Sequence, residues 1–287
     1  MNHPAELAIH SYLNKVMKGE GSISEDNLDK ITSDIRESLL RQFSGGNRKD
    51  FKLRMSNVGK PTCQLWYAKN KPDAAEALPS NFLMNMVLGD LVESVFKGIM
   101  REANVDFSDS GNCTLKVKDK TISGEYDMTI GDKVDDIKSA SPWSFKNKFD
   151  SFYSLAQDDS FGYVSQLAGY AKAIGKKVGG WWVINKANGD FKYVSAENMD
   201  TDKAIKSIEE TIDYLDTDQP FKRCYTAVFE TYRNVSSGNK ILPNGCKFCP
   251  YKKDCWTTLK ELPSKVSKAS IKPMVEYVEL KGETQTL

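Results

Sequence analysis

The most constraining feature of this sequence is the short segment Gly131-Asp132, which lies between two runs with the residue alternation of β-strands. A two-residue turn that begins with glycine is typical of a tight β-hairpin. If these two residues form the turn, Ile130 pairs with Lys133. Counting outward then places Asp127 directly opposite Asp136. Paired positions have Cβ atoms about 4.5–5.5 Å apart, so the sequence predicts two carboxylates side by side on one face of a hairpin.

Two carboxylates at this spacing repel each other unless a cation lies between them. Mg²⁺ and Mn²⁺ are hard ions that bind carboxylate oxygens and keep water ligands for chemistry. Lys138 falls on the same strand face as Asp136, because alternate residues point the same way, and Ile137 points into the core. This arrangement suits phosphodiester hydrolysis, in which Lys138 would orient the attacking water or neutralise charge in the transition state.

Two other interpretations remain open from these residues alone. Asp127, Asp136 and Lys138 could be an exposed row of charges on an edge hairpin, without a catalytic role. A turn longer by one residue would shift the register and put Asp135 in the place of Asp136.

The hydrophobic periodicity of the chain predicts helices and strands in an α/β arrangement. Helices are expected over residues 4–18, 26–43, 79–103, 160–174 and 200–216. Strands are expected over residues 114–117, 121–130, 134–140, 179–185 and 191–195. The first three strands should form an antiparallel meander, and the last two a hairpin around Asn188-Gly189.

Polar side chains on two of these helices extend the candidate site. Glu93 interrupts the apolar helix over residues 79–103, where it could supply a third metal ligand or be an ordinary solvated residue. Gln166 and Tyr170 are four residues apart and therefore share one helix face. Aromatic and basic residues after the second hairpin strand could stack bases and hold phosphates, or belong to the core: Trp143, Phe145, Phe152, Tyr153, Lys146 and Lys148.

The cysteines carry a second signal. Cys246-x-x-Cys249-x5-Cys255 has the spacing of thiolates that bind one metal centre. Cys63 is the best candidate for a fourth ligand, whereas Cys113 and Cys224 are expected to be ordinary small residues in a strand and a linker. Zinc and an iron–sulfur cluster both fit four cysteines, and the spacing in general favours zinc.

Four motifs in order resemble the RecB-type branch of the PD-(D/E)XK nucleases: Gly89-x-x-x-Glu93, Gly124-x-x-Asp127, Asp136-x-Lys138 and Gln166-x-x-x-Tyr170. The resemblance implies a restriction-endonuclease-like core with a central mixed sheet flanked by helices. It also implies metal binding by Glu93, Asp127, Asp136 and the Ile137 carbonyl. Lys138 would then be catalytic, and Gln166 and Tyr170 would contact DNA beside the catalytic aspartates.

One cysteine before these motifs, and Cys-x-x-Cys-Pro with a further cysteine after them, resemble the cluster-bearing RecB-type nucleases. These include the AddB nuclease domain, the CRISPR-associated adaptation exonucleases and the eukaryotic flap-processing helicase-nuclease. The resemblance covers about residues 60–258. It implies a structural 4Fe-4S cluster on Cys63, Cys246, Cys249 and Cys255, and a single-strand DNA exonuclease with 5′ to 3′ polarity in recombination, repair or phage DNA processing.

Composition limits the partners and the location. The net charge is +1, so contact with DNA, single-stranded or with free ends, must come from local patches. No apolar run approaches the roughly 20 residues of a membrane span and no signal-peptide pattern is seen, so we expect a cytoplasmic protein without a membrane partner. A homo-oligomer and a recombination or repair partner stay open.

The expected organisation has three parts: a helical N-terminal extension over residues 1–59, a RecB-like nuclease domain with the cluster over 60–262, and a polar C-terminal tail over 263–287. Two alternative functions remain at this level. One is a catalytically silent nucleic-acid-binding module that has kept the fold, and the other is a zinc-binding structural protein.

Overall fold

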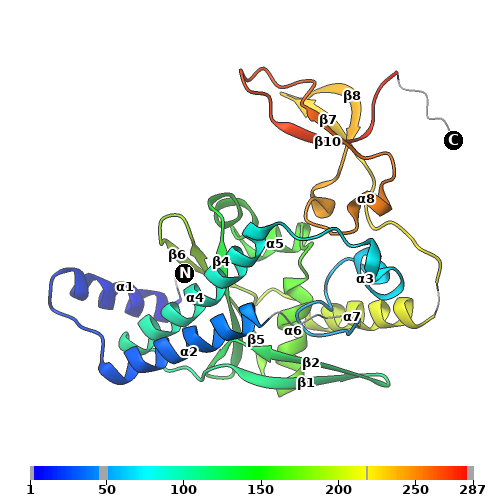
Figure 1. The fold of residues 1–287 in the computed structure, drawn as a ribbon. Helices are drawn as coiled ribbons and strands as arrows, with labels where there is room; N and C mark the ends of the chain where they lie inside the picture. The colour runs from blue at the N-terminus through cyan, green and yellow to red at the C-terminus, as the bar shows by residue number, and fades with distance from the viewer. Residues whose placement is uncertain (1–2, 45–50, 218, 283–287) are drawn as a thin grey trace. The chain divides into compact units, whose positions relative to one another are not determined.

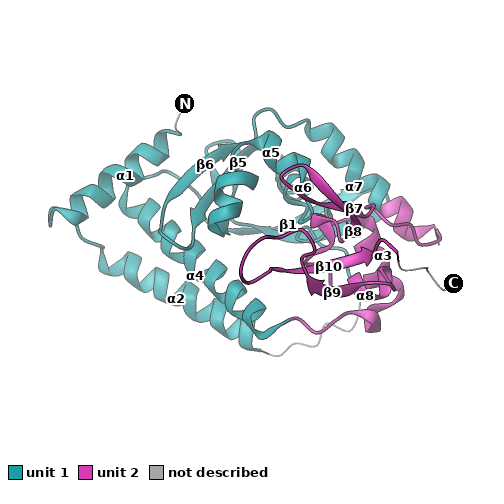
Figure 2. Cartoon of the chain, turned by 90° about the horizontal axis from the view of Figure 1, so that it is seen from above, with its two compact units in different colours: residues 1–59, 79–211 teal, residues 60–78, 212–287 magenta. Residues whose placement is uncertain are grey.

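A computed structural model describes residues 3–44, 51–217 and 219–282 of the chain (Figure 1). The chain divides into two compact units, which Figure 2 colours separately. Unit 1 comprises residues 1–59 and 79–211, and unit 2 comprises residues 60–78 and 212–287. The predicted N-terminal extension thus belongs to the same unit as the carboxylate motifs, whereas the segments that bear the predicted cluster ligands form the other unit.

Unit 1 is built on a four-stranded mixed sheet in the order β3-β4-β5-β6. The bounds of its strands are β3 Met128–Ile130, β4 Lys133–Ala140, β5 Lys177–Asn185 and β6 Phe191–Ser195. β4 and β5 are parallel, and the two outer pairs are antiparallel. A parallel pair needs a crossover, which here contains η2 (Ser144–Lys148), α5 (Phe152–Gln157) and α6 (Tyr163–Ile174). The fold class is therefore α/β, as predicted.

The predicted antiparallel meander is wrong at one point. β1 (Gly111–Val117) and β2 (Lys120–Tyr126) form a separate two-stranded sheet, and the chain passes to the four-stranded sheet at Asp127. The Asp127 carboxylate accepts a hydrogen bond from the backbone N–H of Ile137 in β4. Asp127 lies between the end of β2 and the start of β3, and its side chain therefore makes a hydrogen bond with the backbone of β4.

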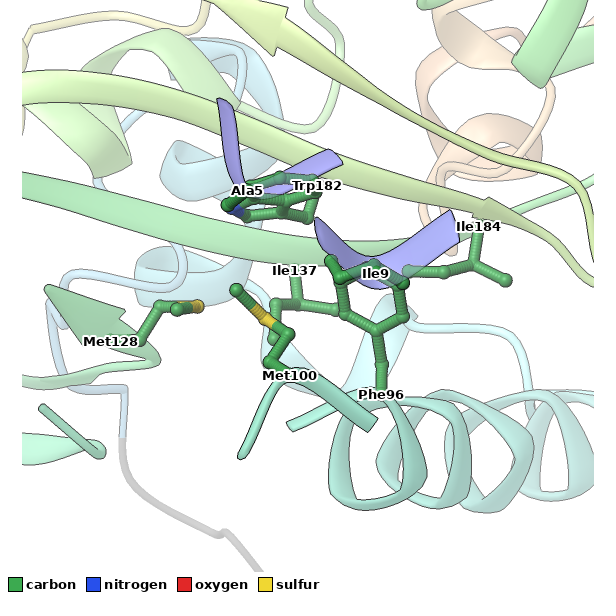
Figure 3. Packing of buried hydrophobic residues seen from close by; sticks show 8 residues of the cluster. All are labelled: Ala5, Ile9, Phe96, Met100, Met128, Ile137, Trp182 and Ile184. Atoms are coloured by element: carbon green, nitrogen blue, oxygen red, sulfur yellow. The ribbon is translucent and has the colours of Figure 1, made fainter. Parts of the chain in front are cut away.

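The helices of unit 1 follow the predicted periodicity: α1 Pro4–Met17, α2 Glu25–Phe43, α4 Ser80–Glu102 and α6, with α7 Thr201–Asp216 running across the boundary into unit 2. Side chains from α1 and α4 pack with residues of the sheet in one buried cluster (Figure 3). Ile9, Met100 and Trp182 in this cluster are fully buried. The cluster also holds Ile137, which confirms that this residue points into the core.

α2 packs closely on α4. The Asn27 side chain donates to the Gly98 carbonyl at 2.8 Å. A Cβ atom at Gly98 would lie 2.3 Å from Ile31 Cδ1, so the absence of a side chain at this position permits the close approach. The N-terminal helices are thus an integral part of unit 1.

Unit 2 contains short helices and a second sheet. Its elements are α3 Thr62–Asn70, η1 Pro72–Ala74, β7 Val228–Tyr232, β8 Val235–Ile241, η3 Asn244–Cys246, α8 Lys252–Cys255, β9 Lys260–Pro263 and β10 Met274–Glu279. The sheet is antiparallel in the order β7-β8-β10-β9. β10 lies within the segment expected to be a polar tail, and its Tyr277 is buried with its hydroxyl donating to Glu230 at 2.7 Å.

Within the described ranges, no helix combines the length and the apolar character that a membrane crossing requires.

Candidate functional site

The hairpin at Gly131-Asp132 has the predicted register. Ile130 pairs with Lys133 and Met128 pairs with Asp135, so that Asp127, one residue before β3, faces Asp136. The alternative that puts Asp135 in the place of Asp136 is wrong, because Asp135 accepts a 2.8 Å hydrogen bond from the Tyr193 hydroxyl of β6.

Asp136 and Lys138 form a buried ion pair. Lys138 Nζ lies 2.5 Å from Asp136 Oδ2, and the Asp136 side chain is 2% exposed. Among the described residues, neither Asp136 oxygen has a hydrogen-bond partner besides this ion-pair contact. The interpretation of these residues as an exposed row of charges is therefore wrong.

Burial dominates the electrostatics of this pair. It raises the pKa of Asp136 to about 8, with Lys138 opposing the rise and Asp127 adding to it. Burial alone would lower the pKa of Lys138, but the charges of Asp136 and Asp127 and the nearby Tyr163 turn the net shift upward. Lys138 is therefore an ammonium at every ordinary pH, whereas the Asp136 carboxylate needs a further cation to be stable in its charged form.

Asp127 is fixed by the backbone of β4. Its Oδ2 accepts a 2.7 Å hydrogen bond from the N–H of Ile137, the residue between Asp136 and Lys138. The Ile137 side chain is buried in the core (Figure 3). The core therefore holds the segment to which the Asp127 carboxylate is tied.

Glu93 and Asp127 line one cavity of about 220 Å³. Burial raises the pKa of Glu93, the charge of Asp127 raises it further, and Lys97 opposes the shift through a 2.6 Å ion pair. The cavity wall carries seven acidic and three basic side chains: Asp34, Glu37, Asp90, Glu93, Asp109, Glu125 and Asp127, with Lys30, Arg41 and Lys97. This excess of acids favours cations, and part of the wall comes from α2.

The donor set fits a divalent cation chemically. The oxygens of Asp136 are buried without hydrogen bonds, and Asp127 lies beside them at the edge of an acidic cavity. Over the ranges that the structure covers, however, no three His, Cys, Asp or Glu side chains are already arranged to hold a metal ion. Binding would therefore require these carboxylates, with Glu93, to move toward the ion.

Gln166 and Tyr170 share one face of α6, as predicted, and Gln166 Nε2 lies 3.1 Å from the Tyr170 hydroxyl. Tyr170 is 3% exposed, and its pKa is raised first by burial and then by the charge of Asp136. A Cβ atom at Gly124 would lie 2.9 Å from the Tyr170 ring and 2.4 Å from Met55 Cβ. Gly124 therefore makes room for Tyr170 beside the acidic pair.

Tyr163 was missed from the sequence. The Lys138 ammonium lies 5.2 Å from the centre of the Tyr163 ring, and burial raises the pKa of this tyrosine to about 12. Phe161 stacks on Tyr163 with ring centres 5.6 Å apart, and Lys148 Nζ lies 4.7 Å from the Phe161 ring. The spacing could have revealed it, since Tyr163 precedes Gln166 by three residues and so shares its helix face.

The other aromatic candidates differ in exposure. Trp143 and Tyr153 are 62% and 63% exposed, whereas Phe152 stacks on the buried Trp181. Phe145 packs under Lys192, whose Nζ lies 4.5 Å from the ring centre. The exposed rings are the ones available for contact with a ligand.

The four predicted cluster ligands all lie in unit 2: Cys63 in α3, Cys246 in η3, Cys249 in the following turn and Cys255 in α8. Burial raises the pKa of Cys246 to about 11, and Cys249, Cys255 and Cys224 raise it further. The pKa of Cys63 is raised, first by its hydrogen bond to Cys224 and then by burial. The thiols are therefore close enough to interact electrostatically.

Two neighbours of these thiols fit thiolate ligands. The Trp256 indole N–H is buried and makes no conventional hydrogen bond with the described residues, yet it lies near enough to Cys246 to oppose the rise of that thiol's pKa. Arg223 donates to the Cys255 carbonyl and opposes the rise of the Cys255 pKa that burial causes. Buried N–H groups and a positive charge stabilise thiolates bound to a cluster.

The two remaining cysteines behave differently. Cys113 is buried in β1, as expected of an ordinary small residue. Cys224 is exposed and lies against Cys63, whose backbone N–H donates to the Cys224 sulfur at 3.0 Å. Cys224 therefore lies in a linker, as predicted, and its contact with Cys63 is a feature that the sequence did not indicate.

No family model matches the sequence, and no curated protein is similar enough to match it. Among solved structures, one described as "Crystal structure of SSO0001" aligns with a TM-score of 0.38 and 13% identity, over 68% of this chain and 89% of that one. At this TM-score the similarity supports no conclusion about function.

Proposed function

We propose that this protein is a divalent-metal-dependent DNA nuclease with a PD-(D/E)XK core, which hydrolyses phosphodiester bonds of single-stranded DNA from a free end. The observation that carries the proposal is the buried Asp136–Lys138 ion pair facing Asp127 across a tight turn.

Burial of the Asp136–Lys138 pair costs free energy on folding. A buried carboxylate without hydrogen bonds loses several kcal/mol of hydration that one ion pair does not fully replace. The Asp136 oxygens are in this state. Strongly shifted groups that face a second carboxylate next to a cavity are typical of active sites.

The roles follow from the contacts. Asp127 and Asp136, with Glu93 and the Ile137 carbonyl, would hold Mg²⁺ or Mn²⁺. Such an ion would activate water and stabilise the departing oxygen. Lys138 keeps its charge and is positioned by Asp136 and the Tyr163 ring, so it would neutralise charge that develops on the phosphoryl oxygens.

Stacked rings beside Lys138 suit a single strand. Phe161 is 41% exposed and lies almost parallel to Tyr163, at an interplanar angle of 12°. Lys148 lies within 5.2 Å of both ring centres and can contact a phosphate. Rings and cations in alternation bind bases and backbone without sequence preference. The 5′ to 3′ polarity rests on the family resemblance alone.

We further propose a 4Fe-4S cluster in unit 2, held by Cys63, Cys246, Cys249 and Cys255. The cluster would link α3 to a segment more than 180 residues later, which is where a crosslink removes most chain entropy. Its proposed role is structural.

The test is incubation of end-labelled single- and double-stranded DNA with Mg²⁺ or Mn²⁺. We expect cleavage by the unsubstituted protein and loss of at least about 100-fold in rate for Asp136→Ala and Lys138→Ala. Asp132→Ala is the matched control, because Asp132 lies in the same hairpin but pairs with Lys177 at the surface. Cleavage that survives both active-site substitutions would refute the site, and DNA binding without cleavage would favour a silent binding module.

A further inference from the structure

Cys224, on the segment between α7 and β7, lies at the start of α3. Its sulfur accepts the 3.0 Å hydrogen bond from the Cys63 N–H and lies 3.4 Å from the Thr62 hydroxyl oxygen. Cys224 therefore shares its surroundings with one of the four proposed ligands.

The residues on either side of Cys224 are anchored beside other parts of the cysteine site. The Arg223 guanidinium donates to the Cys255 carbonyl at 2.6 and 3.1 Å. Tyr225 packs against Gly245, where an added Cβ atom would lie 2.5 Å from the tyrosine ring. Contacts on both flanks thus hold the backbone that places Cys224 against Cys63.

The number of thiols exceeds what one cluster needs. A 4Fe-4S cluster takes one thiolate for each of four irons. Cys246, Cys249 and Cys255 lie within one short segment and supply three of them. One position then remains for two adjacent thiols, the buried Cys63 and the exposed Cys224.

We propose that Cys224 is a second ligand for the iron otherwise held by Cys63, so that the cluster can exchange between the two. This inference rests on the proposed cluster. In such an exchange, the iron–sulfur bond to one cysteine would break as the bond to the other forms. The proton of the incoming thiol would pass to the departing thiolate, and no electron would be transferred. The cluster then tolerates the loss of either cysteine.

The test measures iron and acid-labile sulfide in the full chain, purified without oxygen, for Cys63→Ala, Cys224→Ala and the double variant. Each single variant should keep about half or more of the iron and sulfide of the unsubstituted protein, and the double variant less than about a tenth. Cys249→Ala is the control for cluster loss and should match the double variant. The proposal is overturned if Cys63→Ala holds as little iron and sulfide as Cys249→Ala while Cys224→Ala holds as much as the unsubstituted protein.

A second measurement avoids variants that fold poorly. Native alkylation of the unsubstituted protein with iodoacetamide, followed by peptide mass analysis, should label both Cys63 and Cys224, in amounts that add to about one group per chain. Labelling of Cys224 alone, with Cys63 fully protected, overturns the exchange. Absence of iron and sulfide from the unsubstituted protein would overturn the cluster and the exchange together, while the cleavage assay tests the carboxylate site separately.

Discussion

The Asp127 carboxylate accepts a 2.7 Å hydrogen bond from the backbone N–H of Ile137, and this contact ties the end of β2 to the middle of β4. Because Ile137 separates Asp136 from Lys138, one hydrogen bond sets the position of the first carboxylate relative to the second and to the ammonium. Asp127 thus has a structural role beside its proposed chemical role, and substitution can separate the two.

Asp127→Asn should keep the hydrogen bond, because the amide oxygen still accepts from Ile137, and lose the negative charge. We expect a nuclease rate lower by at least about 100-fold with little change in the free energy of unfolding. Asp127→Ala loses both and should cost about 1–3 kcal/mol of stability as well. Denaturant unfolding and the cleavage assay measure the two effects, and equal stability of the two variants would contradict the structural role.

Lys138→Met should abolish cleavage and destabilise the protein. At a pH above about 8, where Asp136 is ionised in the unsubstituted protein, it leaves this group buried without its partner, and removal of one member of a buried pair costs about 3–5 kcal/mol. The double variant Lys138→Met/Asp136→Asn should recover much of this stability, because no buried charge remains, but none of the activity. A double variant as unstable as the single one would show that the ion pair is not the source of the loss.

The stability of the metal-free protein should depend on pH through two buried aspartates. Burial raises the pKa of Asp136 to about 8 and that of Asp135 to about 6. A raised carboxyl pKa means that the folded state holds the proton more tightly than the unfolded chain. The stabilising contribution of each aspartate is therefore complete below a pH of about 4. It is lost as the pH rises through the pKa that the aspartate has in the folded state.

Asp136→Asn should remove the part of this dependence between a pH of about 4 and 8, so that its free energy of unfolding falls less over this range than that of the unsubstituted protein. Asp135→Asn should remove only the pH dependence of stability between a pH of about 4 and 6. Added Mn²⁺ should stabilise the unsubstituted protein at pH 8 and leave Asp136→Asn almost unchanged, because the cation favours the ionised carboxylate. Parallel unfolding curves for the two proteins at every pH would contradict the proposed titration.

Gly124→Ala should displace Tyr170 from the acidic pair. The new Cβ atom would lie 2.4 Å from Met55 Cβ and 2.9 Å from the Tyr170 ring, and such overpacking costs about 1–3 kcal/mol. Gly89→Ala is the matched control, because its Cβ atom would meet only Ser139 Oγ, at an ordinary 3.7 Å, and alanine favours the helix. Thermal unfolding of both variants checks the contrast, and equal destabilisation would count against the close packing at Gly124.

Cys249→Ala should yield a colourless, poorly soluble protein, because the proposed cluster would lose a ligand for which no second cysteine is proposed. Cys113→Ala is the control: Cys113 is also buried, but it lies in β1 of unit 1. Visible absorption and iron content separate the two variants. A brown, stable Cys249→Ala protein would contradict the ligand assignment.

Local patterns were sufficient for much of the fold. The hairpin register follows from a two-residue turn and the period of a strand, both of which lie within a few residues of Asp127 and Asp136, so the sequence alone predicts that these carboxylates face each other. The helices α1, α2, α4 and α6 follow from apolar periodicity, and the spacing of Cys246, Cys249 and Cys255 predicts a metal centre.

Only the tertiary structure decided what surrounds these residues. Burial of the Asp136–Lys138 pair, the acidic cavity wall supplied by α2, and the contact between Cys63 and Cys224 depend on segments that are far apart in the sequence. The passage from one sheet to the other at Asp127 depends on a side-chain hydrogen bond that no periodicity signals. The physical reason is that turns and strand alternation act between neighbours, whereas burial and charge pairing are set by whichever distant residues the packed core brings together.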